Sequence, residues 1–225
     1  MRSSAASDVY KRQEQHIITL NDKRYKMLDH ICFLSKNLYN AGLYIIKQEF
    51  LSTGKWIRCT DLNKKMVSED NPDFRAMSGS SSQQVLMRLD NNLKSYFSSI
   101  KAWKRDNKKF TGCPKFPKYK DKVKGRNVFT YSYAQIRHKG EYIYFPKKEG
   151  LSPLKTRCKE GSVKQVRIIP RQGCYVIELI YESSCKEQKV DNNRVMSIDL
   201  GINNLASIVT NLSLIHISEP TRLQL

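Results

Sequence analysis

The feature that most constrains the fold is a long helical pattern that runs from Ser82 to about Asp106. Apolar and aromatic residues recur in it at intervals of three and four, so they share one side of a helix. One stripe along the helix consists of Val85, Leu89, Asn92, Tyr96, Ile100 and Trp103. Three neighbouring residues widen this stripe: Leu86, Leu93 and Phe97. A face this broad is not stable in water, so the pattern predicts a helix packed against other elements.

Two shorter helical patterns come before the long one. The first can be capped by Asn21 or Asp22 and ended by Gly54, and its apolar positions are Leu28, Ile31, Leu34, Leu38, Ala41 and Ile45. Thr60 can cap a short second helix. We therefore expect the first half of the chain to hold three helices, between about residues 22 and 106.

The second half has the composition of β-strands. Four segments rich in β-branched and aromatic residues are separated by Gly and Pro turns: Val128 to Tyr133, Tyr142 to Phe145, Val163 to Ile169 and Tyr175 to Tyr181. A β-leaning run, His16 to Leu20, precedes the helices, and a last apolar strand, Val195 to Ile198, follows a polar linker. Together with the helices, these segments predict an α+β fold.

The charge of the chain indicates its class of partner. Lys and Arg number 40 against 21 Asp and Glu, which gives a formal net charge of +19. An excess of this size repels itself in a compact fold unless a polyanion neutralises it, and this favours nucleic acid as the partner. No apolar run approaches the roughly 20 residues of a membrane span, and no signal-peptide pattern is present. We therefore expect no membrane partner and a cytoplasmic location, whereas the oligomeric state is not indicated.

A basic loop from Lys108 to Arg126 lies between the helical and the β half. Gly and Pro break its periodicity, while lysines recur among aromatic residues. This mixture suits phosphate contacts combined with stacking on bases, although a solvated surface loop can have the same composition. The net charge favours binding. The candidate nucleic-acid contacts, on the long helix and in the loop, are Lys94, Lys101, Lys104, Arg105, Lys108, Lys109, Lys115, Phe116, Lys118, Tyr119, Lys120, Lys122, Lys124 and Arg126.

A second candidate site is the segment Ser197-Ile198-Asp199-Leu200-Gly201. Here a strand ends on a carboxylate, a glycine permits a tight turn, and an apolar run returns as a hairpin. Metal-dependent cleavage of phosphodiesters needs carboxylates fixed on rigid elements, where they hold Mg²⁺. A strand-end Asp is fixed in this way, but Asp is also common at turns without any metal. Spacing alone leaves both roles open for Asp199.

The cysteines and histidines indicate no further site. Six Cys and four His contain no Cys-x-x-Cys pair and no spacing typical of metal ligands. We therefore expect no zinc in this chain and no nucleophilic catalysis from these residues.

Both ends of the chain differ from its middle. Ser3 to Gln13 resembles the translation of a sequencing-library adapter, and Leu212 to Arg222 resembles its partner. Asp8 to Gln13 can be encoded by GAT GTG TAT AAG AGA CAG, whose reverse complement encodes Leu212 to Ile217. Independent segments are rarely complementary in this way, so residues 1–13 and 212–225 are interpreted as adapter-like tails. The rest holds 36 Lys and Arg against 19 Asp and Glu, a net charge of +17.

The segment Ile198 to Ala206 resembles the opening of the RuvC nuclease domain in TnpB-type (OrfB) transposon proteins and in the related type V CRISPR effectors. The order before it is similar too: a short strand, a helix with Leu38-Tyr39-Asn40, a helical insertion, and the Gly-x-Pro-x-Phe-Pro-x-Tyr-Lys loop of Gly112 to Lys120. The resemblance implies an OB-like wedge β-barrel with a helical recognition insertion (residues 14–190) and the first hairpin of an RNase H-like domain (residues 191–211). It also implies guide RNA and target DNA as partners.

In that family Asp199 corresponds to the first Mg²⁺ ligand. The other catalytic residues, a Glu and a second Asp, and a four-cysteine zinc module come later in those proteins than Asn211 does here. We therefore expect a truncated transposase-associated endonuclease that binds nucleic acid and is inactive in cleavage. One alternative is a basic RNA- or DNA-binding module that is not an enzyme. Another alternative is an actin-like ATPase. The first phosphate-binding loop of such ATPases is similar to the segment around Asp199, but it stands at the beginning of their domain.

Overall fold

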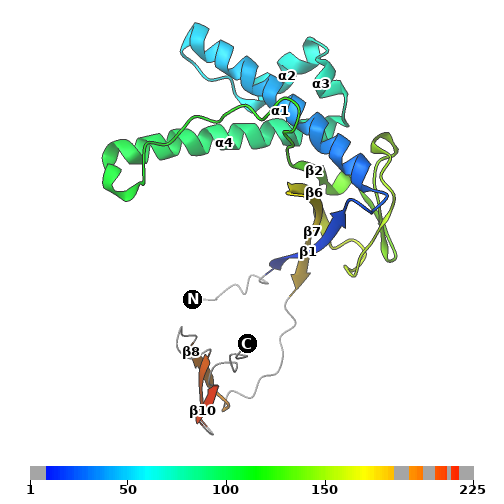
Figure 1. Cartoon of the computed structure of the whole chain (residues 1–225), viewed down its shortest axis with the longest axis vertical. Helices are drawn as coiled ribbons and strands as arrows, with labels where there is room; N and C mark the ends of the chain where they lie inside the picture. The colour runs from blue at the N-terminus through cyan, green and yellow to red at the C-terminus, as the bar shows by residue number, and fades with distance from the viewer. Residues whose placement is uncertain (1–8, 185–192, 200–205, 212–213, 218–225) are drawn as a thin grey trace, which may run out of the picture. The chain divides into compact units, whose positions relative to one another are not determined.

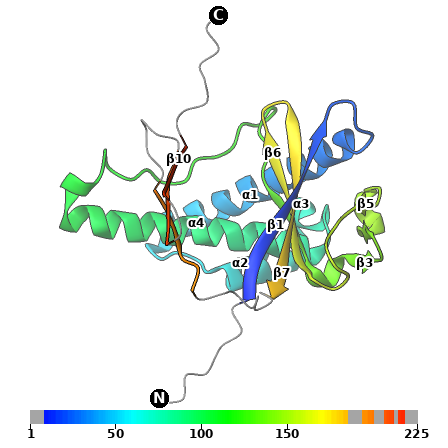
Figure 2. The ribbon, with the colours of Figure 1, turned by 90° about the horizontal axis from the view of Figure 1, so that it is seen from below.

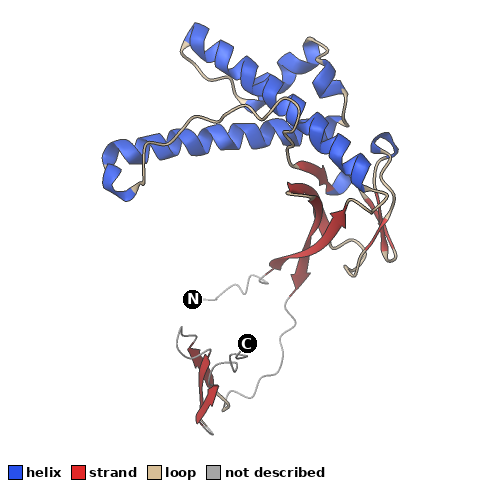
Figure 3. Cartoon of the chain, viewed as in Figure 1, coloured by secondary structure: helices blue, strands red, loops and turns tan. Residues whose placement is uncertain are grey.

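The structure of the chain is a computed structural model that describes residues 9–184, 193–199, 206–211 and 214–217. The chain divides into two compact units, Met1–Ser184 and Cys185–Leu225. The first unit combines helices with antiparallel sheets, and the second holds a small antiparallel sheet (Figures 1 and 3). The α+β class expected from the sequence is therefore confirmed. Within the described residues, no helix is both long enough and apolar enough to cross a membrane.

Four α-helices follow the first strand: α1 (Tyr25–Thr53), α2 (Cys59–Ser68), α3 (Pro72–Arg75) and α4 (Gly79–Arg105). Three of the six predicted stripe positions of α1 are buried, Leu28, Ile31 and Leu38, whereas Leu34, Ala41 and Ile45 are half-buried. Gly54 ends the helix in a left-handed conformation with φ 69°. Its start differs from the expectation. Asp22 accepts the amide of Arg24 at 2.8 Å and forms a turn, so the helix begins at Tyr25 without a side-chain cap.

The two long helices, α1 and α4, pack closely against each other. A Cβ atom added to Gly42 of α1 would lie 2.9 Å from Leu86 and 3.0 Å from Leu89, both on α4. Only glycine lets the backbone of α1 approach these side chains without forcing them to move. Leu86 and Leu89 are fully buried in a core that also contains residues of the sheet.

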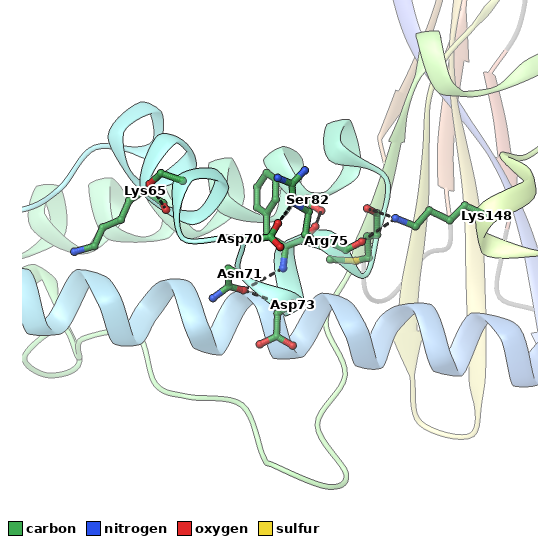
Figure 4. A network of polar contacts seen from close by, with 10 residues as sticks. Lys65, Asp70, Asn71, Asp73, Arg75, Ser82 and Lys148 are labelled. Atoms are coloured by element: carbon green, nitrogen blue, oxygen red, sulfur yellow. Dashed lines mark hydrogen bonds and ion pairs between the residues drawn. The ribbon is translucent and has the colours of Figure 1, made fainter.

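A polar network fixes the beginning of α4 (Figure 4). Asn71 accepts the amides of Asp73 and Phe74 and so caps α3. Ser82 of α4 donates its hydroxyl to the Phe74 carbonyl at 2.8 Å. Lys148, from the β half of the chain, donates to the carbonyls of Arg75 and Met77 at 2.8 and 2.9 Å. These bonds connect α3, α4 and the β half before the long helix begins.

The main sheet has four antiparallel strands in the order β1-β7-β6-β2: β1 (Val9–Thr19), β7 (Cys174–Ser184), β6 (Val163–Arg171) and β2 (Phe129–Ser132). The four α-helices of the described residues lie between β1 and β2 in the sequence, so they separate two strands of one sheet. One face of the sheet contributes Phe129, Val166, Ile168, Ile177 and Leu179 to the core, which also contains residues of α1. In Figure 2 strands β1, β7 and β6 cross in front of the helices.

A smaller sheet is formed by β3 (Arg137–Lys139), β4 (Tyr142–Tyr144) and β5 (Leu154–Lys155). Short 3-10 turns accompany it: η1 (Asn107–Lys109), η2 (Tyr133–Gln135) and η3 (Lys147–Glu149). The ladders among the described residues leave the two sheets of the first unit separate. The closed OB-like barrel therefore stays a prediction.

The second unit contains β8 (Met196–Asp199), β9 (Ala206–Thr210) and β10 (Leu214–Ile217) in the order β10-β9-β8. Strands β8 and β9 form the antiparallel hairpin that the sequence predicts, with the backbone of Asp199 opposite Ser207. Residues 200–205, which connect the two strands, lie outside the described residues.

Two strands reach into the segments that resemble adapter sequence. β1 begins at Val9 and not near His16, and its first five residues pair with residues 180–184 of β7. β10 pairs with β9 in the second unit. A short β-prone stretch can add to an open sheet edge because the edge offers unpaired backbone N–H and C=O groups. This general property accounts for both additions, which the sequence analysis missed.

Candidate nucleic-acid interface

The second half of α4 extends beyond the core. Burial along its apolar stripe ends at Leu93, whereas Tyr96, Phe97, Ile100 and Trp103 are only half-buried. Rings from elsewhere cover part of this stretch, since Trp56 stacks on Phe97 with ring centroids 5.1 Å apart. The broad buried face expected over the whole helix is therefore confirmed only for its first half. Beyond Leu93, the side chains of α4 are half-buried or exposed.

The chain returns from the end of α4 as the loop of residues 106–127, which crosses α1 before it reaches β2 (Figure 1). Asn40 on α1 holds the loop at one point, because its amide group donates to the Lys120 carbonyl and accepts the Lys120 amide, each at 2.9 Å. Buried Lys36 donates to the Lys122 carbonyl at 2.6 Å, and burial lowers the pKa of Lys36. The loop is therefore held against α1 at these points.

Arg126 holds the end of the loop against α1. Its guanidinium donates to both carboxylate oxygens of Asp29 on α1, at 2.7 and 2.8 Å. The hydroxyl of Tyr175 on β7 donates to the same carboxylate at 2.6 Å. The hydrogen bond from Arg126 holds the pKa of Asp29 below its ordinary value. Arg126, a candidate nucleic-acid contact in the sequence, thus has a carboxylate partner within the chain.

Aromatic residues of the loop pack on both long helices. Phe116 meets the edge of Tyr96 on α4, with centroids 5.2 Å apart. The ammonium of Lys47 on α1 lies 4.3 Å from the centroid of the Tyr119 ring and 5.4 Å from that of Phe116. Tyr119 is nevertheless 45% exposed, so one part of its ring remains available for stacking. Phe116 contributes mainly to holding the loop in place.

Most of the predicted cations face solvent without a carboxylate partner. Residues 101–126 contain eleven Lys and Arg and only two Asp, a net charge of +9. Asp106 pairs with Lys109 at 3.3 Å, and Asp121 accepts the amides of Val123 and Lys124. Eight exposed cations in this stretch have no carboxylate within 4.0 Å among the described residues, and we call them the basic surface: Lys101, Lys104, Arg105, Lys108, Lys115, Lys118, Lys122 and Lys124.

The remaining candidates are placed differently. Lys94 pairs with buried Asp90 on the same helix at 2.7 Å, and Lys109 pairs with Asp106 as described above. Lys120 is half-buried, with its ammonium 5.3 Å from the ring centroid of Tyr39. The structure thus brings most of the predicted residues onto one helix end and one loop, while a minority form contacts within the protein.

Trp103 lies beside cations of the basic surface at the end of α4, although its place in the helical stripe predicted a core position. It lines a hollow of about 550 Å³ together with Lys104, Arg105, Asp106, Asn107 and Lys108. An indole ring beside several cations can stack on a base while the cations contact its phosphates. The spacing of the stripe concealed this residue, because periodicity does not show where a helix leaves the core.

Asp199, the predicted metal ligand, ends β8, and its side chain lies outside the described part of the chain. Within the described residues, no group of three or more His, Cys, Asp or Glu side chains could hold a metal ion. A single strand-end carboxylate does not make an Mg²⁺ site by itself, so the role of Asp199 as a metal ligand stays a prediction.

Comparisons with known proteins give similarities to solved structures. No family model and no curated protein matches the chain. A solved structure that is similar to it is a cryo-EM structure of a Cas12f1–sgRNA–target DNA complex, with 13% sequence identity and a TM-score of 0.37. The match covers 92% of this chain and 57% of the solved one. The chain therefore spans little more than half the length of that protein.

Proposed function

We propose that the chain binds nucleic acid through the basic surface. The observation that carries this proposal is the set of eight exposed cations without carboxylate partners between Lys101 and Lys124. Both Asp residues of this stretch are already occupied by local contacts, so the protein supplies no counter-charge of its own. A phosphate backbone supplies one, and release of its condensed counterions favours binding.

The form of the surface favours a strand with accessible bases. Trp103 lines the hollow at the end of α4, and the ring of Tyr119 is 45% exposed in the loop. Aromatic rings among cations stack on unpaired bases and tolerate any sequence, because every base has a flat face. Single-stranded RNA or DNA, or an unpaired part of a structured RNA, is therefore the expected ligand.

Neutralising four of these cations tests the proposal. We expect the variant with Lys104, Lys108, Lys115 and Lys118 replaced by Gln to bind a labelled mixed-sequence single-stranded RNA more weakly than the unmodified chain. The slope of log Kd against log salt should decrease by up to about 3, since each phosphate contact on a single strand contributes about 0.7.

A matched control separates this surface from net charge. Lys55, Lys139, Lys147 and Lys159 are exposed and lie outside the basic surface, and their replacement by Gln changes the net charge equally. The control variant should keep most of the affinity and of the salt slope. Equal losses in both variants would show that binding depends on total charge and not on this surface.

We extend the proposal to a longer protein of which this chain would be one part, because the segment around Asp199 resembles the opening of a RuvC nuclease domain. The chain is then the front part of a transposon-associated, RNA-guided DNA endonuclease, with guide RNA and target DNA as its ligands and Asp199 as the first Mg²⁺ ligand. The hairpin of β8 and β9, with Asp199 at the end of β8, agrees with this role. Because the described residues do not complete a metal site, the proposed activity of the chain itself is binding alone.

Sequencing the source gene beyond the codon of Asn211 tests this extension. A reading frame that continues to a Glu, a second Asp and two Cys-x-x-Cys pairs is expected. A stop codon at that point would contradict the nuclease assignment and leave a basic binding module, with Asp199 as a turn residue.

A further inference from the structure

Two contacts hold the basic loop along one side of α1 (Figure 1). Asn40 forms two hydrogen bonds with the backbone of Lys120, each at 2.9 Å. Seven residues later on α1, the Lys47 ammonium lies over the ring of Tyr119, 4.3 Å from its centroid. Seven residues make almost two full helical turns, so both contacts lie on the same side of α1. That side therefore faces the Tyr119–Lys120 segment of the loop.

Tyr44 lies between these two contacts on the same side of α1. It follows Asn40 by four residues and precedes Lys47 by three, the two spacings that make side chains neighbours on a helix surface. At a rise of about 1.5 Å per residue, Tyr44 stands about 6 Å along the helix axis from Asn40 and about 4.5 Å from Lys47. Its side chain is therefore placed beside Tyr119 of the loop. Burial raises the pKa of Tyr119, and the phenol of Tyr44 raises it further, which agrees with this placement.

Both tyrosine rings remain open to solvent. Tyr44 is 57% exposed and Tyr119 is 45% exposed. Tyr44 forms no hydrogen bond and no ring contact with the other described residues. Lys47 occupies one face of the Tyr119 ring, which leaves the opposite face for a ligand. A single exposed aromatic residue is common on proteins, but two at one place indicate a surface for a partner.

The charge around the two rings indicates the class of partner. Lys115 and Lys118, both members of the basic surface, come shortly before Tyr119 in the loop. The only carboxylate of α1 beyond residue 40 is that of Glu49, which lies on the opposite side of the helix and pairs with Lys65 at 3.5 Å. Interfaces between proteins have few charged residues at their centre, whereas aromatic rings among cations are typical of surfaces that bind single-stranded nucleic acid.

We propose that Tyr44 and Tyr119 form a stacking subsite for unpaired bases of the strand that contacts the basic surface. The inference rests on the proposed function and adds to it a second element, α1, with a residue far from the stretch of residues 101–124. Each ring stacks on the flat face of a base, while Lys115 and Lys118 contact neighbouring phosphates. Lys47 is a positioning residue, because its ammonium holds the Tyr119 ring through a cation–π contact.

Tyr44→Ala tests the inference in the full chain, with Tyr133→Ala as the matched control. Tyr133 is also 57% exposed, but it lies on η2 between β2 and β3. We expect Tyr44→Ala to weaken binding of a labelled single-stranded RNA by roughly 5- to 150-fold, the loss that one stacked base predicts. The slope of log Kd against log salt should stay unchanged, because a tyrosine neutralises no phosphate. Tyr44→Phe, which keeps the ring, should bind like the unmodified chain, and so should Tyr133→Ala.

An abasic strand separates base stacking from other roles of Tyr44. A ribose-phosphate strand of the same length keeps every phosphate but has no flat base for a ring to stack on. The unmodified chain should bind the RNA more tightly than the abasic strand, and Tyr44→Ala should reduce this difference. Thermal unfolding without nucleic acid is the second measurement. The Tm of Tyr44→Ala should stay within about 2 °C of that of the unmodified chain, because an exposed side chain contributes little to stability.

The outcomes distinguish this inference from the proposed function. Unchanged RNA affinity in Tyr44→Ala would overturn the inference and leave the two rings as a surface for a protein partner. An equal loss of affinity for the RNA and for the abasic strand, with a larger decrease in Tm, would assign Tyr44 a structural role and also overturn it. The proposed function would survive either result, provided that neutralising the basic surface still weakens binding. Failure of the unmodified chain to bind RNA would overturn both.

Discussion

Replacing Asn40 by Ala should release the basic loop from α1. Asn40 forms two hydrogen bonds with the backbone of Lys120, one as donor and one as acceptor, both at 2.9 Å. A hydrogen bond of this kind contributes about 0.5–1.5 kcal/mol net, so the variant should lose about 1–3 kcal/mol. A domain of this size changes its Tm by about 2–4 °C per kcal/mol, which predicts a decrease of about 2–12 °C.

Hydrogen exchange locates the effect. The Lys120 amide is protected by Asn40, so its exchange in the variant should accelerate by roughly 5- to 150-fold, as follows from about 1–3 kcal/mol. The buried amide of Leu89 in α4 should be affected less, because it opens only with the core. Asn37→Ala is the matched control, since Asn37 lies on the same helix and forms no side-chain hydrogen bond with the described residues. Equal exchange of the Lys120 amide in Asn40→Ala and the unmodified chain would refute the docking of the loop on α1.

Three further perturbations follow from named contacts. Leu89→Ala should destabilise the first unit by about 2–5 kcal/mol in urea unfolding, because Leu89 is fully buried, whereas Met87→Ala, at 48% exposure, should stay within about 0.5 kcal/mol. Asp29→Asn should cost about 1–2 kcal/mol at pH 7, and the cost is modest because the Asp29 side chain is 36% exposed. The folded pKa of Asp29 lies below the ordinary 3.8 because of Arg126, so this difference should persist above that value and vanish as the pH falls through the folded pKa. Trp103→Ala should weaken binding of single-stranded RNA by roughly 5- to 150-fold, because the loss of one stacked base costs about 1–3 kcal/mol. The same variant should abolish the quenching of indole fluorescence by RNA. The control variant Trp56→Phe should retain both the affinity and the quenching.

Local patterns predicted the elements well. The stripe of α1, its end at Gly54 and the long course of α4 follow from helical periodicity and from one glycine that can adopt a left-handed conformation. The strands β6 and β7 were predicted from β-branched and aromatic residues, although both continue beyond the predicted ends. Each of these features depends on residues that are neighbours in the sequence, which explains why the sequence alone is sufficient.

The contacts that shape the interface could not be predicted in this way. Asn40 and Lys120 are 80 positions apart, and Asp29 and Arg126 are 97 apart. Composition does not distinguish Arg126, which pairs with Asp29, from Lys124, which faces solvent. Likewise, the helical periodicity predicted a core position for Trp103. Periodicity does not show that α4 extends beyond the elements that cover its first half.

The central claim is that nucleic acid binds at the basic surface, and photo-crosslinking tests it most directly. The full chain is crosslinked to a single-stranded RNA that contains 4-thiouridine, and the modified peptides are identified by mass spectrometry. The account predicts crosslinks concentrated in residues 101–124, with Trp103 and Tyr119 among the modified positions. Crosslinks spread evenly over the exposed lysines of the first unit, or confined to the small sheet of β3, β4 and β5, would contradict it.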